Sequence, residues 1–141
     1  MLKETLKYTD FDGNEREEDF YFNFTKAELM QMELSVEGGF HSFIDSIMRA
    51  QNVTELIRVF KDLIDRSYGV KSPDGRRFIK NPEALADFAS TEAYSDLFMK
   101  LATDTNAASR FVNGIFPASL QAEVAQETAK RQGVLSGPGS K

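Results

Sequence analysis

The sequence predicts an α+β protein that is mostly α-helical, with an N-terminal β-hairpin followed by a bundle of about five to seven short helices. Three observations support this prediction. An Asp-Gly pair at residues 12–13 separates two strand-like segments, and apolar residues recur at steps of three and four through most of the remaining chain. A Pro-Asp-Gly turn at residues 73–75 marks a small hairpin near residues 70–79.

The N-terminal hairpin has one face that needs cover. On its second strand Phe20, Phe22 and Phe24 alternate with polar residues and Tyr21, so the three Phe rings lie on one face. We expect helices to pack on these rings, because large apolar surface is buried wherever an element is available to cover it. The acidic run over residues 10–19 lacks the glycine and glutamate spacing of a calcium-binding loop and indicates a charged hairpin tip.

Two helices should follow the hairpin. Thr25 and Glu28 form a capping-box pattern at the start of the first helix, and the pair Gly38-Gly39 ends it. The second helix, in the segment FHSFIDSIMRAQ, places its apolar side chains at helical spacing, with Met48 beside them. These apolar residues are Phe40, Phe43, Ile44 and Ile47.

The clearest helix runs from Asn52 to Gly69, with Asn52 as its cap and Gly69 as a left-handed C-terminal residue. Charged residues occupy one side of this helix, and an apolar stripe occupies the other. The stripe consists of Val53, Leu56, Ile57, Phe60, Leu63 and Ile64. Val59 lies off the stripe, so it is either an exposed single residue or part of a second contact face.

Three further helices are expected after the small hairpin, each with a recognisable start. Asn81 caps the first, Ser90 or Thr91 the second, and Asp104 or Thr105 the third. We expect one helical domain over residues 1–116. The segment 117–141 has thin apolar content and predicts a weakly packed C-terminal helix and a flexible tail.

Composition narrows the function classes. The 141 residues carry a net charge of −5, which disfavours binding of nucleic acid. The chain has no Cys, a single His and no segment of membrane-spanning length, so we assign no catalytic residue, no cofactor, no metal ligand and no membrane contact. His41 is expected to be structural, since a lone His without nearby partners is seldom a ligand.

Two other hypotheses for the function stay open at this point. The first is a small ligand-binding domain or enzyme that uses an unrecognised cleft of carboxylates and tyrosines. The second is a regulatory adaptor that binds an acidic partner through a basic loop. That loop contains Lys71, Arg76, Arg77 and Lys80.

One resemblance covers most of the chain, from about Phe20 to Pro117. The aromatic strand FYFNF leading into the Thr25 helix, the segment DRSYGVKSPDGRRFIKN and the segment AYSDLFMKLATD are similar to tail assembly chaperones of long-tailed, siphovirus-type bacteriophages, notably those of Gram-positive hosts. The resemblance implies a non-enzymatic protein of the host cytoplasm that binds the hydrophobic tape measure protein until the tail tube polymerises around it. It also implies absence from the mature virion.

The resemblance further implies a longer form made by ribosomal frameshifting, through which the tail tube protein could be contacted. We expect the partner to lie in an apolar groove between helices, and we expect self-association as a consequence of exposing such a groove. The candidate partner-binding residues are Phe40, Phe43, Ile44, Ile47, Met48, Val59 and Phe60.

Overall fold

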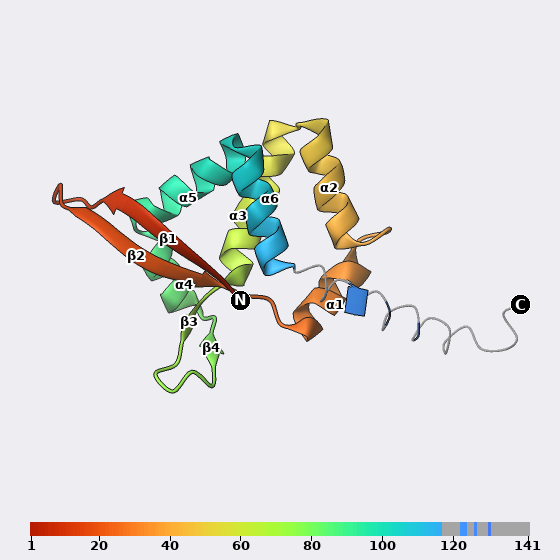
Figure 1. Cartoon of the computed structure of the whole chain (residues 1–141), viewed down its shortest axis with the longest axis horizontal. Coiled ribbons are helices and arrows are strands. Elements are labelled where there is room, and N and C mark those ends of the chain that lie inside the picture. The colour runs from red at the N-terminus through yellow and green to blue at the C-terminus, as the bar shows by residue number, and fades with distance from the viewer. Residues whose placement is uncertain (117–121, 124–125, 127–129, 131–141) are drawn as a thin grey trace, which may run out of the picture.

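The computed structural model describes residues 1–116 together with residues 122, 123, 126 and 130 (Figure 1). Within these residues the chain forms a four-stranded sheet and six helices, which confirms the predicted α+β, mostly helical class. The expected C-terminal helix and tail fall almost entirely outside the described residues. Their separation from a domain over residues 1–116 therefore stays a prediction.

The two hairpins join into one antiparallel sheet in the order β1-β2-β3-β4. Strands β1 (Leu2–Thr9) and β2 (Glu15–Phe22) pair along their whole length. Strand β3 (Tyr68–Lys71) pairs with β2 only next to Phe22 and with β4 (Phe78–Ile79) beyond that point. Both hairpins were predicted, but their union was not, since the β2–β3 contact joins residues more than forty positions apart in the sequence.

The six helices gather on one side of the hairpin. In Figure 1 the β1–β2 hairpin projects to the left, α3 and α6 occupy the centre, and α1 and α2 lie to the right. Helices α5 and α6 pack against β1, and α4 packs against β3. The helices are α1 (Lys26–Ser35), α2 (Phe40–Ala50), α3 (Val53–Ser67), α4 (Pro82–Ala89), α5 (Glu92–Thr103) and α6 (Thr105–Ile115).

Side-chain caps fix where most helices begin, as the sequence predicts. The Thr25 hydroxyl accepts from the Glu28 backbone N–H while the Glu28 carboxylate accepts from the Thr25 N–H, which confirms the capping box of α1. The remaining caps accept hydrogen bonds from backbone N–H groups in the first turn of α3, α4, α5 and α6. These caps are Asn52, Asn81, Thr91 and Asp104.

Aromatic rings connect the sheet to the helices. The buried Phe22 ring lies 5.3 Å from Phe111 of α6 and 6.0 Å from Phe88 of α4, measured between centroids. Phe20 contacts Phe88, and Phe24, just past the end of β2, contacts Phe116. Helices therefore cover the Phe face of the hairpin, as predicted from the alternation of apolar residues.

The stripe predicted on the central helix is partly wrong. Val59 is buried in the core, whereas Val53 is 58% exposed and Ile57 is 40% exposed. The core-facing side of α3 is thus rotated toward Val59, because α3 packs against both α2 and α5 and needs two adjoining contact faces.

The role assigned to Gly69 is also wrong. Gly69 lies in β3 with a negative or extended backbone, and the residues with left-handed glycine geometry are elsewhere. A Cβ atom at Gly69 would meet the Phe78 ring at 2.5 Å. The glycine is therefore required by the close approach of a ring from β4, and a helix ending does not require it.

Candidate functional site

The candidate partner-binding residues are mostly core residues in this conformation. Phe43 and Met48 are half-buried and lie on opposite sides of the buried face of α2. The other five are at most 9% exposed and belong to one continuous apolar cluster. These buried residues are Phe40, Ile44, Ile47, Val59 and Phe60. Sequence periodicity finds the apolar face of a helix, but it does not tell whether a neighbouring helix covers that face.

Helix α2 is bounded by special backbone geometry at both ends. Gly38 and Gly39 precede it with φ values of +84° and +95°, and Gln51 follows it in the left-handed conformation with a φ of 53°. The N-cap residue of α2 is Gly39, which has no side chain to cap the first turn. Instead Glu33 of α1 accepts a hydrogen bond from the His41 backbone N–H at 3.0 Å. The attachment of α2 to the chain is therefore made of two conformationally unusual joints.

The N-terminal end of α2 lies against the end of α6. The Phe40 ring centroid is 5.8 Å from that of Phe116 and 6.1 Å from that of Phe43. At the other end, a small hollow of about 50 Å³ is lined by Met48 of α2, Leu56 of α3 and Leu101 of α5, among others. Apolar side chains from three helices therefore adjoin Met48, and this hollow is the nearest feature to the groove expected from the sequence.

A larger cleft of about 500 Å³ lies between β2, β3 and α4, and we call it the hairpin cleft. It forms because β3 turns away from β2 after two residue pairs, while β2 continues to Glu15 without a second neighbour. Aromatic rings form its floor: the Phe88 centroid lies 4.4 Å from Tyr68 and 4.7 Å from Phe20.

The rim of the hairpin cleft is acidic. Glu18, Asp19 and Asp87 line it, and Lys71 lies at one end with its Nζ 4.3 Å from the Tyr21 ring centroid. Burial raises the pKa of Tyr68, and the nearby Asp87 carboxylate adds to the shift. Tyrosines and carboxylates thus line one cleft, which is the feature that a ligand-binding domain or enzyme would require.

The basic loop predicted from the sequence is divided by the structure. Lys71 rests on Tyr21, and the Lys80 ammonium pairs with Glu28 at 3.0 Å and lies 4.7 Å from the Phe24 ring centroid. In the part of the chain that the structure describes, Arg76 and Arg77 form no ion pair, and both are exposed. Two free guanidinium groups therefore remain at the tip of the β3–β4 loop, residues 72–77.

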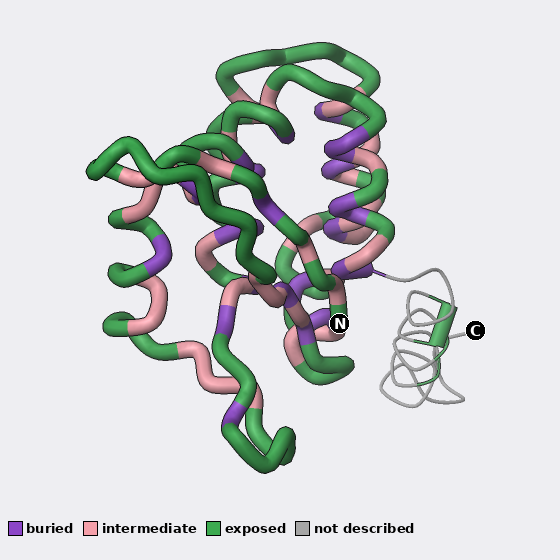
Figure 2. The backbone as a smooth tube through the Cα atoms, turned by 60° about the vertical axis from the view of Figure 1, so that its left-hand side comes forward, coloured by how far each residue is buried: buried purple, intermediate pink, exposed green. Residues whose placement is uncertain are grey.

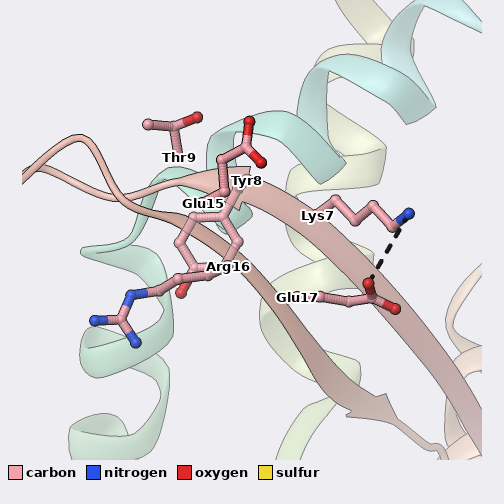
Figure 3. A pocket seen from close by; sticks show the side chains of 6 residues that line it. All are labelled: Lys7, Tyr8, Thr9, Glu15, Arg16 and Glu17. Atoms are coloured by element: carbon pink, nitrogen blue, oxygen red, sulfur yellow. Dashed lines mark ion pairs between the residues drawn. The ribbon is translucent and has the colours of Figure 1, made fainter.

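A third hollow, of about 450 Å³, lies on the outer part of the hairpin and is lined by residues of β1 and β2 (Figure 3). Lys7 and Glu17 pair across it at 3.9 Å. The Tyr8 hydroxyl donates to Glu18, and Arg16 pairs with Asp10 at 2.6 Å, which lowers the pKa of Asp10. Its polar groups satisfy one another along an exposed hairpin, so this hollow is a weaker candidate than the hairpin cleft.

Two further kinds of site were tested against the described residues. Among them, no group of three or more His, Asp or Glu side chains could hold a metal ion. His41 lies half-buried in the first turn of α2. None of the helices in the described part of the chain is long and apolar enough to cross a membrane.

Comparison with known proteins gives one match. A family model described as phage tail assembly chaperone matches residues 1–137 of this chain. The match includes the hairpin, all six helices and most of the segment that follows them. Searches of curated proteins and of solved structures return no match.

Proposed function

Since this chain belongs to the phage tail assembly chaperones, we propose that it binds the hydrophobic tape measure protein and keeps it in solution until the tail tube polymerises around it. It acts by covering apolar segments of that protein, without catalysis. The observation that supports this proposal most is that Phe43 and Met48 of α2 are only partly buried, on the two sides of a helix face that packs on a continuous apolar cluster.

The proposed binding surface consists of the α2 face and the part of α3 next to it. Phe43 and Met48 make the first contact. Movement of α2 about its two joints, at Gly38-Gly39 and at Gln51, then exposes the buried members of the set. The full surface is Phe40, Phe43, Ile44, Ile47, Met48, Val59 and Phe60.

With this movement, the same apolar residues can be buried in the free protein and contact the partner in the complex. A chaperone with a permanently exposed apolar groove would aggregate, because large exposed apolar patches associate. A groove that is closed in the free protein avoids this, at the expense of affinity, since binding must supply the free energy of opening. The glycines that precede α2 allow a backbone change there that most residues would resist.

Co-expression with the tape measure protein of the same phage tests the proposal. The wild-type chain should raise the soluble fraction of that protein and co-purify with it. Met48→Asp should abolish co-purification, because a carboxylate cannot be buried against apolar side chains without a partner. Met99→Asp is the matched control, since Met99 is 53% exposed on α5, outside the proposed surface.

Circular dichroism of the free variants separates a loss of binding from a loss of folding. Met48 and Phe43 are half-buried, so Asp at either position should leave the circular dichroism of the free chain unchanged, whereas Ile44 is 1% exposed and Asp there would unfold the helix contacts. A folded Met48→Asp variant that still co-purifies as well as the wild type would contradict the proposed surface. Failure of the wild-type chain to solubilise the tape measure protein would contradict the proposed function.

The remaining parts of the proposal concern the setting. We place the protein in the cytoplasm of an infected Gram-positive host and outside the finished virion. We further propose a longer form, made by ribosomal frameshifting near the end of the first reading frame. Its extension contacts the tail tube protein. Sequencing of the gene tests this last point: a slippery site with an overlapping reading frame supports it, and the absence of both refutes it.

A further inference from the structure

We propose that the hairpin cleft binds the β3–β4 loop of a second copy of this chain, so that two copies exchange their loops reciprocally. This self-association goes beyond the proposed capture of an apolar partner and uses a different face of the molecule. It concerns the sheet, whereas partner capture concerns α2 and α3.

The first argument is that the cleft has the size and lining of a binding site. Its volume of about 500 Å³ falls within the roughly 300–1,000 Å³ of pockets that hold ligands. Its floor includes the partly exposed Phe20 and Tyr68 rings, which both pack on the buried Phe88 ring. Val70 on its wall is 44% exposed.

The second argument is charge complementarity. The cleft rim carries Glu18, Asp19 and Asp87, and Asp87 has no ion-pair partner among the described residues. At the β3–β4 loop, the Arg76 and Arg77 guanidinium groups are equally unpaired. An Arg side chain suits such a cleft, because its planar guanidinium can stack on an aromatic ring and pair with a carboxylate together.

The third argument is that the loop is built as a rigid, projecting element. Ser72 N–H donates to the Arg77 carbonyl at 2.8 Å, and the Ser72 hydroxyl donates to Asp74 at 2.6 Å while accepting from the Arg77 N–H. Figure 2 shows this loop as an exposed projection at the bottom of the molecule. A pre-organised loop loses little conformational freedom when it binds.

The fourth argument concerns geometry. Val70 and Lys71 of β3 line the cleft. The loop that follows them projects below α4 and away from the β1–β2 hairpin (Figure 1), so it does not turn back toward the elements that line the cleft of its own copy. Cleft and loop both adjoin β3. A two-fold axis beside β3 would therefore place the loop of each copy in the cleft of the other, which closes the assembly as a dimer.

Sedimentation equilibrium on the full chain, from micromolar to millimolar concentration, tests this proposal. The wild type should dimerise, and its dissociation constant should rise between ~0.05 M and ~0.5 M NaCl because the contacts are partly ionic. Arg77→Glu should weaken the dimer by about 100-fold, since about tenfold is lost at each of two equivalent junctions. Arg110→Glu is the matched control, because Arg110 is an exposed residue of α6, a helix that belongs neither to the lining of the cleft nor to the loop.

A charge exchange gives the sharpest form of the test. Arg76→Glu/Arg77→Glu in one chain and Asp87→Lys in the other should each impair self-association. When the two variants are mixed, the acidic loop of the first faces the lysine that replaces Asp87, and the basic loop of the second faces Asp87, so the mixed pair should form more tightly than either variant alone and a tag on one should retain the other. Unchanged circular dichroism of each variant shows that its fold is intact.

Three outcomes would overturn the proposal. They are a wild type that stays monomeric over the whole concentration range at low salt, an Arg77→Glu dimer as tight as that of Arg110→Glu, and folded charge-exchange variants that do not pair. Met48→Asp should dimerise normally, so loss of partner capture and loss of self-association are distinguishable.

Discussion

Helices α2 and α3 are neighbours with similar apolar patterns, yet the structure holds them differently. The core-facing residues Phe60, Leu63 and Ile64 of α3 are 0% exposed, although Val53 and Ile57 on the same helix are exposed. The core-facing residues of α2 are less completely covered, since Phe40 and Ile47 are each 8% exposed. Helix α3 lies between two other helices, since α2 packs on one side and α5 on the other. Helix α2 lies at the margin of the molecule, beside α1 (Figure 1).

Polar contacts sharpen this contrast. The Tyr94 hydroxyl of α5 donates to Asp65 of α3 at 2.7 Å, and burial together with this carboxylate raises the pKa of Tyr94 to about 12. Helix α3 also has its own N-cap, Asn52, and continues directly into β3. In α2, by contrast, the His41 backbone N–H of the first turn donates to the Glu33 carboxylate of α1. From this difference we infer that α3 anchors the fold and propose that α2 is the helix that moves on binding.

The largest predicted effect compares a Phe on each helix. Phe60→Ala should lower the free energy of unfolding by about 3–5 kcal/mol, because it leaves a cavity in a fully buried site. Phe43→Ala should lower it by less, about 1–3 kcal/mol, since part of that side chain already contacts water. Urea unfolding of both variants measures the difference. Equal losses would mean that α2 is as firmly packed as α3.

Much of the fold could be predicted because its signals are local. Thr25 with Glu28, Asn81 with Pro82, and the Asp-Gly turn at residues 12–13 each act within a few residues, and each stands where the sequence places it. The misses are non-local. Gly69 is set by a ring from β4, and the joining of the two hairpins depends on a contact between distant segments.

The site was less predictable than the fold for the same reason. The periodicity of α2 identifies Phe40, Ile44 and Ile47 as one apolar face, but burial of that face is decided by α1, α3 and α6. The hairpin cleft gave no sequence signal, because it assembles Asp19, Tyr68 and Asp87 from three elements. The sequence does show the charges of the two parts, an acidic hairpin and a basic loop, but it does not show that the hairpin borders a cleft.

A smaller effect tests how firmly α1, the other neighbour of α2, is held. Burial alone would raise the pKa of Glu28, but hydrogen bonds from the Thr25 N–H and the Lys80 ammonium outweigh burial and lower it. A lowered folded-state pKa means that ionised Glu28 stabilises the fold above the pKa of the unfolded chain. This stabilisation is lost as the pH falls through the lowered value.

Glu28→Gln should therefore reduce the free energy of unfolding near neutral pH by about 0.5–1 kcal/mol, a modest amount because both partners are partly exposed. The reduction should shrink as the pH falls from the ordinary glutamate pKa of about 4.3 through the lowered pKa of folded Glu28, because protonation then removes the charge from the wild-type carboxyl as well. Thermal unfolding as a function of pH measures both. Glu37→Gln, at an exposed position between α1 and α2, is the control and should leave the free energy of unfolding near neutral pH unchanged.

A change in stability of similar size is expected from a substitution at Gln51, the joint after α2. Gln51 holds a left-handed conformation that glycine adopts without strain, so Gln51→Gly should raise the free energy of unfolding by about 0.5–1 kcal/mol. The same substitution at Gln31, an exposed position inside α1, should lower it by about 1 kcal/mol, because glycine weakens a helix interior. Amide hydrogen exchange should then show slower exchange in α2 of Gln51→Gly and unchanged exchange in α3. If α3 gained protection equally, the two helices would open as one unit, and the distinction between an anchored and a movable helix would fail.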